Sequence, residues 1–175
     1  MGDKKRILIV DDESINIELL TIYLDEQYDI VGAMSGEEAL DIASAEPRPN
    51  LILLDITMNG MDGYETCSRL KSNPDTQHIP VVFLTALDHK EEEATGLQAG
   101  AVDYISKPIY PETVKARVSI QLALEEAQSQ LRKAKRIVAA QKAEIDRLND
   151  VKSKLIEMVR SRNARIEQLT DQAAQ

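Results

Sequence analysis

The stretch Leu51-Ile52-Leu53-Leu54-Asp55 decides the fold of this chain. Four consecutive apolar residues are typical of a strand that is covered on both faces, as in a parallel sheet. The run ends at a carboxylate, and residues 56–63 contain two glycines and an asparagine, which predicts a loop. Functional sites of open parallel sheets lie beyond the carboxyl ends of the strands. Asp55 therefore stands where a functional site is expected.

Similar apolar runs recur along the chain and alternate with helical patterns. Strands are predicted at residues 6–10, 30–31, 51–54, 80–84 and 102–105, and helices at 14–26, 35–45, 62–71, 88–100 and from 111 onward. Ser35, with Glu38 three residues later, forms a capping box that begins the second helix. The alternation predicts an α/β fold, a flavodoxin-like doubly wound five-stranded parallel sheet of order 2-1-3-4-5.

The fifth predicted helix has no evident end, because residues 112–175 contain neither Gly nor Pro. An apolar heptad seam runs along it, formed by Leu124, Leu131, Val138, Ile145, Leu148, Leu155, Val159, Ile166 and Leu169. A seam of about seven repeats predicts a coiled coil. A helix of about 60 residues would be about 90 Å long and could not bury this stripe alone. We therefore expect residues 1–122 to form one domain and residues 123–175 a C-terminal coiled-coil extension.

The seam is imperfect, which bears on the oligomeric state. Three polar residues interrupt it, namely Gln141, Lys152 and Arg162. Four further apolar residues widen it, namely Ile137, Val151, Ile156 and Met158. Polar seam residues fix register at some cost in stability, and a wide stripe leaves room for four helices. A parallel homodimer is the first expectation, and a tetramer stays open.

Charge and composition narrow the class of partner. Residues 1–124 hold 10 Lys and Arg against 22 Asp and Glu, a net charge of −12, whereas residues 125–175 hold 11 against 8, a net charge of +3. This balance argues against direct nucleic-acid binding. A single cysteine, Cys67, excludes an intramolecular disulfide and favours a cytoplasmic protein. We expect no membrane span and no signal segment, since no apolar run is long enough.

Polar side chains follow four of the predicted strands. Asp11 and Asp12 follow the first strand, Asp55 the third, Thr85 the fourth and Lys107 the fifth. Three carboxylates that meet at one edge repel one another, and a hard cation such as Mg²⁺ relieves this while leaving room for a phosphate. The Lys107 ammonium and the Thr85 hydroxyl beside Asp55 favour phosphoryl transfer onto its carboxylate.

These residues resemble the receiver domain of two-component response regulators. The resemblance covers about residues 4–122 and rests on Asp11-Asp12, the Asp-x-x-Met-x-x-Met-Asp-Gly loop at 55–63, Thr85-Ala86 and Tyr104-Ile105-Ser106-Lys107-Pro108. It implies that Asp55 is the phosphoacceptor for a sensor histidine kinase. It also implies a regulatory domain, not an enzyme, whose only chemistry is the gain and loss of its own phosphoryl group.

The resemblance further implies a role for each residue of the site. Asp12, Asp55 and the backbone carbonyl of Thr57 would bind Mg²⁺ directly, and Asp11 would act mainly through water. Lys107 would pair with the phosphate, and the Lys107–Pro108 peptide bond would be cis. Thr85 would swing toward the phosphate while Tyr104 turns inward. That motion would reshape the surface of the fourth helix, fifth strand and fifth helix, where receivers commonly dimerise.

One departure from the family pattern lies in the loop after Asp55. Asn59 stands where the family usually has Pro, and we expect it to loosen the loop slightly.

Other functions fit the sequence less well. A phosphatase with an aspartyl nucleophile usually needs a second acid two residues later, where this chain has Thr57. A transcription factor would need a helix-turn-helix after residue 122, where the pattern predicts one continuous helix. The receiver resemblance leaves open whether the coiled coil serves an attached output domain, as in regulators with cyclic-dinucleotide enzymes, or a stand-alone adaptor that docks a downstream protein.

Overall fold

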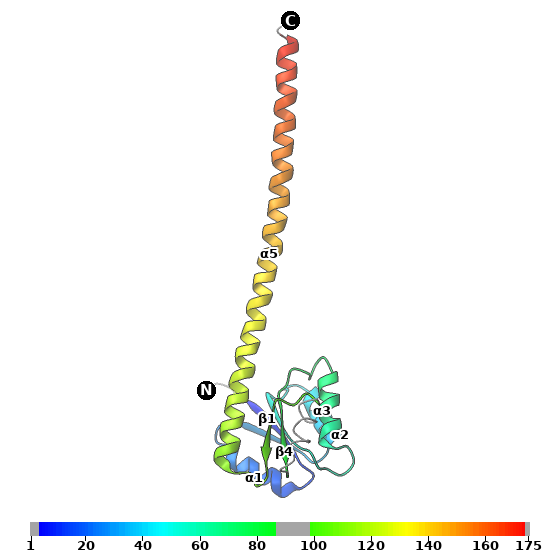
Figure 1. The fold of residues 1–175 in the computed structure, drawn as a ribbon, viewed down its shortest axis with the longest axis vertical. Coiled ribbons are helices and arrows are strands. Elements are labelled where there is room, and N and C mark those ends of the chain that lie inside the picture. Colours follow the sequence, from blue (N-terminus) through cyan, green and yellow to red (C-terminus); the bar gives the residue numbers. More distant parts are fainter. Residues whose placement is uncertain (1–3, 87–98, 174–175) are drawn as a thin grey trace. The chain divides into compact units, whose positions relative to one another are not determined.

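The computed structural model describes residues 4–86 and 99–173, which form five strands and four helices (Figure 1). The strands are β1 (Arg6–Val10), β2 (Asp29–Ala33), β3 (Leu51–Asp55), β4 (Val81–Thr85) and β5 (Asp103–Ser106). The helices are α1 (Ser14–Leu24), α2 (Gly36–Ser44), α3 (Gly63–Ser72) and α5 (Pro111–Ala173). The helix predicted at residues 88–100 lies almost entirely outside the described residues.

The five strands form one parallel sheet of order β2-β1-β3-β4-β5. This order confirms the predicted flavodoxin-like fold. β3 lies at the centre, and all five of its residues are buried, as its unbroken apolar run predicts. β2 is an edge strand and is only partly buried, which agrees with its weaker apolar pattern. β5 begins one residue later than predicted, and α1 ends two residues earlier, at Leu24.

Side chains of each strand alternate between two separate apolar cores, one on each face of the sheet. On one face Leu8, Ile52 and Leu54 pack with residues of α2 and α3. On the other face Ile7 and Leu53 pack with residues of α1 and the first two turns of α5. The two pairs of helices cover opposite faces of the sheet (Figure 1). Because helices cover both faces, the parts of the sheet that remain accessible are the ends of its strands, where polar residues lie.

Two helix caps read from the sequence are formed. The hydroxyl oxygen of Ser35 accepts a hydrogen bond of 3.2 Å from the backbone N–H of Glu38 at the start of α2. The carboxylate of Asp62 accepts a hydrogen bond of 2.7 Å from the backbone N–H of Glu65 at the start of α3. These caps fix where α2 and α3 begin.

Gly63, the first residue of α3, lies against the end of β3. A Cβ atom at this position would lie 2.7 Å from the Cα of Ile56 and would also clash with the backbone carbonyl of Asp55. The N–H of Gly63 donates a hydrogen bond of 2.9 Å to the carbonyl of Ile56. Only a glycine allows this close approach, which holds the loop after Asp55 against the sheet.

Cys67 is buried in α3. Its Sγ lies 3.4 Å from the carbonyl oxygen of Ala99. Burial raises the pKa of this thiol to about 11, and the nearby Lys71 opposes the shift only in part. Cys67 is therefore a small apolar core residue, as free buried cysteines usually are.

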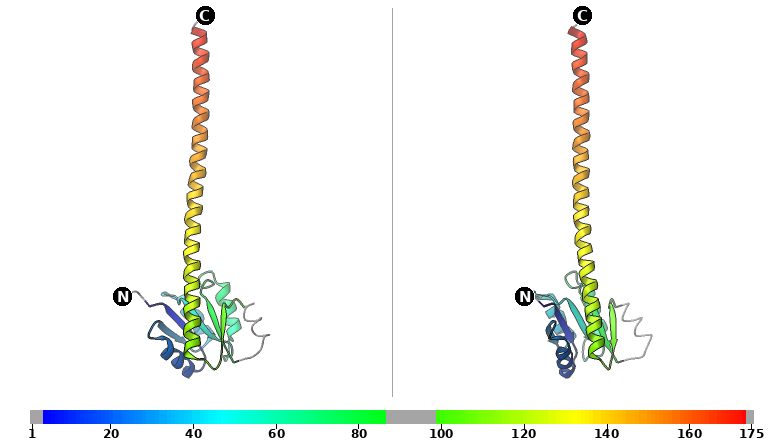
Figure 2. Two further views of the ribbon diagram at one scale, coloured as in Figure 1. Left: turned by 60° about the vertical axis from the view of Figure 1, so that its left-hand side comes forward. Right: turned by 90° about the vertical axis from the view of Figure 1, so that its left-hand side faces the viewer.

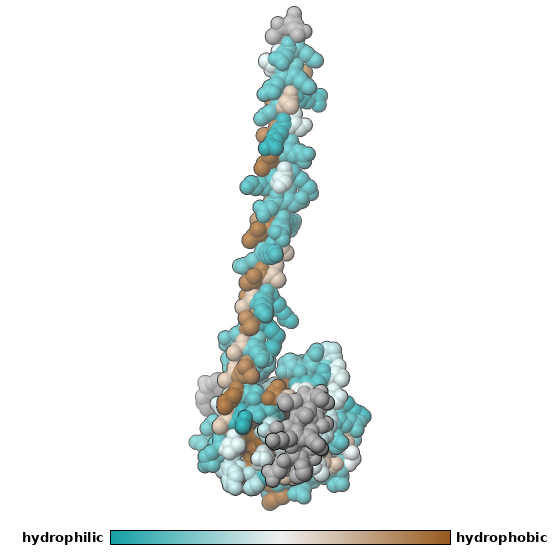
Figure 3. Space-filling view, in the orientation of Figure 1, coloured by the Kyte–Doolittle hydropathy of each residue, from teal (hydrophilic) through white to brown (hydrophobic). Residues whose placement is uncertain are grey.

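α5 continues unbroken for 63 residues (Figure 2). By internal contacts the chain divides into two units, Met1–Glu126 and Ala127–Gln175, and α5 contributes to both. In the first unit Val114 and Val118 of α5 are fully buried. In the second unit every described side chain from residue 130 onward is exposed. Apolar side chains recur along this part of the helix (Figure 3), and those of the heptad seam are about half exposed.

Among residues 4–86 and 99–173, no helix joins sufficient length to sufficient apolar character for a transmembrane segment.

Candidate functional site

Three carboxylates meet at the carboxyl edge of the sheet. Asp11 and Asp12 follow β1, Asp55 ends β3, and these two strands are hydrogen-bonded neighbours. One oxygen from each carboxylate lies within 4.8 Å of the other two. Asp11 is fully buried and Asp55 is 6% exposed, whereas Asp12 lies at the half-exposed rim. Three acidic groups at such distances repel one another strongly, so the cluster needs positive charge.

Lys107 brings positive charge to the two buried carboxylates. It follows β5, and its backbone N–H donates a hydrogen bond of 2.6 Å to the carbonyl of Thr85 at the end of β4. Its Nζ lies 3.0 Å from Oδ1 of Asp55 and 3.2 Å from Oδ2 of Asp11. The Lys107–Pro108 peptide bond is cis. One ammonium therefore serves two carboxylates, and the cluster as a whole keeps excess negative charge.

The pKa shifts of Asp55 and Lys107 reflect this environment. Burial is the largest influence on Asp55 and raises its pKa above the ordinary value, while the hydrogen bond and charge of Lys107 act in the opposite direction. Burial alone would lower the pKa of Lys107, but its bonds and charge interactions with Asp55 and Asp11 outweigh that effect and raise it. Lys107 is therefore held as an ammonium. For Asp55, the interactions with Lys107 offset only part of the effect of burial on its pKa.

Two asparagines that the sequence patterns did not single out as ligand-holding residues support the acidic pair. Nδ2 of Asn16, in the first turn of α1, lies 3.0 Å from both oxygens of Asp11, whose Oδ1 also accepts a 2.9 Å bond from the N–H of Glu13. Asn59 donates to Oδ2 of Asp12 from both its backbone N, at 3.0 Å, and its Nδ2, at 2.7 Å. The loop expected to be loosened by Asn59 is instead tied to Asp12.

The remaining predicted site residues lie close to this edge of the sheet at different depths. Thr85, the last residue of β4, is buried and pairs in register with Ser106, next to Lys107. Thr57 is exposed in the loop after β3. Tyr104, in β5, lies three residues before Lys107 and is partly exposed, at 38%. The surface that was expected to include the fourth helix falls partly outside the described residues.

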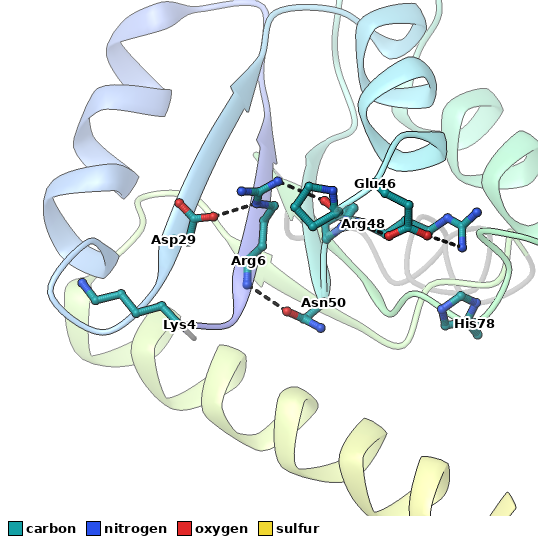
Figure 4. A pocket seen from close by; sticks show the side chains of 9 residues that line it. Lys4, Arg6, Asp29, Glu46, Arg48, Asn50 and His78 are labelled. Atoms are coloured by element: carbon teal, nitrogen blue, oxygen red, sulfur yellow. Dashed lines mark hydrogen bonds and ion pairs between the residues drawn. The ribbon is translucent and has the colours of Figure 1, made fainter. Parts of the chain in front are cut away.

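A pocket of about 810 Å³ lies at the opposite edge of the sheet (Figure 4). Two of its cations are ion-paired, because Arg6 pairs with Asp29 at 2.7 Å and Arg48 pairs with Glu46 at 2.9 Å, and Lys4 donates to the backbone carbonyl of Asp25. Asn50 accepts a 2.8 Å hydrogen bond from the backbone N–H of Arg6. The charges of this pocket are mixed in sign, whereas the carboxyl edge gathers three carboxylates, so the candidate site remains at Asp55.

The sheet order, the acidic cluster and the facing lysine are those of a receiver domain. Residues 7–119 match the response regulator receiver domain family. The match covers well over half of the chain, and the protein therefore belongs to that family.

Known relatives agree with this assignment. Response regulator PleD of Caulobacter vibrioides is 47% identical over 114 residues, which are 65% of this chain and 25% of PleD. A Vibrio cholerae protein named "Probable cyclic di-GMP phosphodiesterase" is 46% identical over 116 residues, 66% of this chain and 26% of that protein. The chain thus spans about a quarter of the length of each of these relatives.

A solved structure gives the same fold. The response regulator receiver domain protein from Methanospirillum hungatei superposes with a TM-score of 0.66 at 28% identity, and the superposition covers 72% of this chain and 99% of that protein. The similarity extends across the whole of that receiver domain. The chain is thus a two-component response regulator receiver that continues into a long helix.

Proposed function

We propose that Asp55 is the phosphoacceptor of this receiver and that a sensor histidine kinase supplies the phosphoryl group. The observation that carries the proposal is the position of the Asp55 carboxylate, at the end of the central strand, 3.0 Å from the Lys107 ammonium and within 4.8 Å of two further carboxylates. A carboxylate so placed is open to an incoming group at the sheet edge and has a cation beside it. Regulation, with no turnover of a separate substrate, is the activity that this arrangement favours.

The residues present suit Mg²⁺. Their donor atoms are carboxylate and carbonyl oxygens, and Mg²⁺ prefers such hard ligands, keeps several waters and accepts a phosphate oxygen. We infer that Asp12, Asp55 and the backbone carbonyl of Thr57 hold it directly and that Asp11 holds it through water. The bound cation would neutralise the excess charge of the cluster and of the phosphoryl oxygens.

Phosphoryl transfer would need little covalent work from the protein. A carboxylate oxygen of Asp55 bonds to the phosphorus as the phosphorus–nitrogen bond of the kinase phosphohistidine breaks. The electron pair of that bond leaves with the imidazole nitrogen, and the product is an acyl phosphate on Asp55. Lys107 would then exchange its contact with Asp55 for one with a phosphoryl oxygen, since the new group neutralises the acceptor carboxylate.

Thr85 and Tyr104 are proposed to carry the change to the surface. Thr85 ends the strand beside β3, and its hydroxyl is suited to donate to a phosphoryl oxygen on Asp55. Tyr104 is partly exposed on β5, next to β4 in register. Movement of Thr85 toward the phosphate would open space behind it for the Tyr104 ring. The affected surface then lies along β5 and the start of α5, where a second receiver could pack.

The extended part of α5 is proposed to form a parallel coiled-coil homodimer. Its seam residues are 48–63% exposed, an exposure that apolar side chains at regular heptad spacing rarely keep in an assembled protein. In a parallel pair each seam residue meets its own copy, so Lys152 and Arg162 would disfavour other registers. Phosphorylation would alter the packing of the paired helices, and an attached output domain or a docked protein would respond.

The proposal is tested by phosphorylating the chain with a small phosphodonor and Mg²⁺ and measuring intact mass. We expect the wild type to gain one phosphoryl group, Asp55→Asn to gain none, and the exposed-carboxylate control Asp41→Asn to behave as wild type. Light scattering on the same samples, with and without beryllofluoride, reports assembly. Phosphorylation of Asp55→Asn at the wild-type rate would disprove the assignment, and a monomer in every sample would disprove the homodimer.

A further inference from the structure

The rim carboxylate of the site, Asp12, is held by a residue far away in sequence. Its Oδ2 accepts two hydrogen bonds from Asn59, one of 3.0 Å from the backbone N and one of 2.7 Å from the side-chain Nδ2. The two residues are 47 positions apart, in the loops after β1 and β3. Among the described residues, these are the hydrogen bonds that the structure gives to the Asp12 carboxylate.

Asp11 and Asp12 differ in what would happen without their partners. Asp11 is fully buried and is fixed by Glu13, Asn16 and Lys107 together. Asp12 is half exposed, and a carboxylate side chain at that depth is free to turn into water. Asn59 therefore determines whether the third oxygen ligand of the cluster faces its neighbours or the solvent.

The geometry of the tether is compatible with a bound cation. Both Asn59 donors use the same oxygen, Oδ2, so the other oxygen of Asp12 is not engaged by Asn59. With the tether in place, ligand oxygens of Asp11, Asp12 and Asp55 already lie within 4.8 Å of one another. This spacing leaves room for one Mg²⁺ that Asp12 and Asp55 bind directly and Asp11 binds through water.

We propose that Asn59 is a positioning residue that sets the affinity of the site for Mg²⁺ by holding Asp12 toward the cluster. The inference rests on the proposed magnesium site. Hydrogen-bond donors to a ligating carboxylate orient it, and their removal typically costs about tenfold or more in metal affinity. Asn59 is itself exposed, so we expect its effect to be smaller than this, at most about tenfold.

The two hydrogen bonds can be removed one at a time. Asn59→Ala deletes the amide but keeps the backbone N–H, whereas Asn59→Pro deletes both donors, because proline has no N–H. We expect the Mg²⁺ dissociation constant to rise about three- to tenfold in Asn59→Ala and further in Asn59→Pro. Asn149→Ala, the same truncation at an exposed position of α5, is the control, and we expect it to leave the Mg²⁺ dissociation constant unchanged.

The experiment is a Mg²⁺ titration of each full-length variant followed by amide NMR. The Asn59 side-chain amide of the wild type supplies a signature that a purely structural role would not give, because its resonances shift as the cation binds at Asp12. Urea unfolding of the metal-free proteins shows that each variant is folded. The expected order of Mg²⁺ affinity is wild type, then Asn59→Ala, then Asn59→Pro.

Failure of this inference and failure of the magnesium site give different results. Equal or tighter Mg²⁺ binding by folded Asn59→Ala overturns the positioning role, since a tighter site would mean that the amide competes with the cation for Asp12. A wild type that binds no Mg²⁺, or binds it equally well as Asp12→Ala, overturns the magnesium site itself and the inference with it.

Discussion

The phosphoacceptor site and the heptad seam of α5 invert the usual distribution of residues in opposite ways. At the site a carboxylate, Asp55, is only 6% exposed, whereas in the seam an apolar residue such as Leu155 is 59% exposed. Buried acids and exposed apolar stripes are both unusual in a folded chain. In the function proposed above, a component outside the chain completes each place, a cation and a phosphoryl group in one case and another helix in the other.

The two regions differ in how much of their stabilisation the chain supplies itself. Lys107 already pairs with the two buried carboxylates of the acidic cluster, and Asn16 and Asn59 donate hydrogen bonds to Asp11 and Asp12. Among the described residues, nothing comparable covers the apolar seam from Leu131 to Leu169, whose side chains are all exposed. The comparison teaches that the site is preorganised for small ligands, whereas the seam depends on assembly.

The largest expected effect comes from the seam. Leu148→Ala combined with Leu155→Ala keeps helix propensity, since Ala is the best helix former, but removes two buried side chains from each helix of a dimer. At about 2 kcal/mol per side chain the dimer would weaken by about 8 kcal/mol, more than 10⁴-fold. Sedimentation measures this, and the outward-facing Ser153→Ala should keep the wild-type mass. An unchanged mass in the double variant would contradict the seam.

The second effect concerns the cation beside the acceptor. Lys107→Ala removes the ammonium that contacts Asp55 and Asp11, and we expect phosphorylation by a small phosphodonor to slow about 10²- to 10³-fold. Mass-spectrometric time courses measure the rate, and Lys142→Ala on the exposed helix serves as the matched control. The dimer should be unaffected. A rate within about twofold of wild type would show that Lys107 does not stabilise the transferring group.

The third effect is a loss of stability where the start of α3 packs against the loop after Asp55. Gly63→Ala places a Cβ against Ile56 and the carbonyl of Asp55, and we expect a loss of about 2–3 kcal/mol in the free energy of unfolding. Gly60→Ala separates backbone strain from crowding, because Gly60 has φ of 82° with no atom within 4 Å of a built Cβ. That variant should lose only about 1 kcal/mol. Urea denaturation compares them, and a smaller loss for Gly63→Ala would refute the crowding.

The smallest effect is expected where the sheet meets the first turns of α5. Arg117 pairs with Asp103 of β5 at 3.0 Å, but Gln121 also donates to that carboxylate at 3.2 Å. Arg117 is half exposed, so Arg117→Ala should cost about 0.5–1 kcal/mol of unfolding free energy. Arg147→Ala, in a looser exposed pair, should cost less. A loss above about 2 kcal/mol for Arg117→Ala would mean that the pair is shielded from solvent.

Much of the fold could be predicted because its signals are local in sequence. The apolar run at residues 51–54, the caps at Ser35 and Asp62 and the Gly- and Pro-free helix each depend on neighbouring residues. The crossover rules then leave few strand orders, of which the flavodoxin-like order was the one expected. The convergence of Asp11, Asp12, Asp55 and Lys107 is a consequence of that order, because parallel strands end at one edge.

The details of support could not be predicted, because they depend on loops that meet only in the folded chain. Asn59 reads as a flexible substitute for proline, yet its two donors reach Asp12. Asn16 reads as one polar residue on a helix, yet it faces Asp11. A signal was present in hindsight, since carboxylates that are buried or partly buried require donors, and each asparagine lies within five residues of an acidic residue of the site.

The inert thiol of Cys67 gives the molecule a practical property. Because burial raises its pKa to about 11 and its Sγ is enclosed, Cys67 forms little thiolate near neutral pH, and we expect it to react with maleimides or methanethiosulfonates far more slowly than an exposed cysteine. A cysteine introduced by Ser161→Cys can therefore take a spin label selectively, without removal of the native thiol. In a parallel pair the two labels would lie side by side, whereas an antiparallel pair centred on the 123–175 segment would separate them by about 35 Å along the axis.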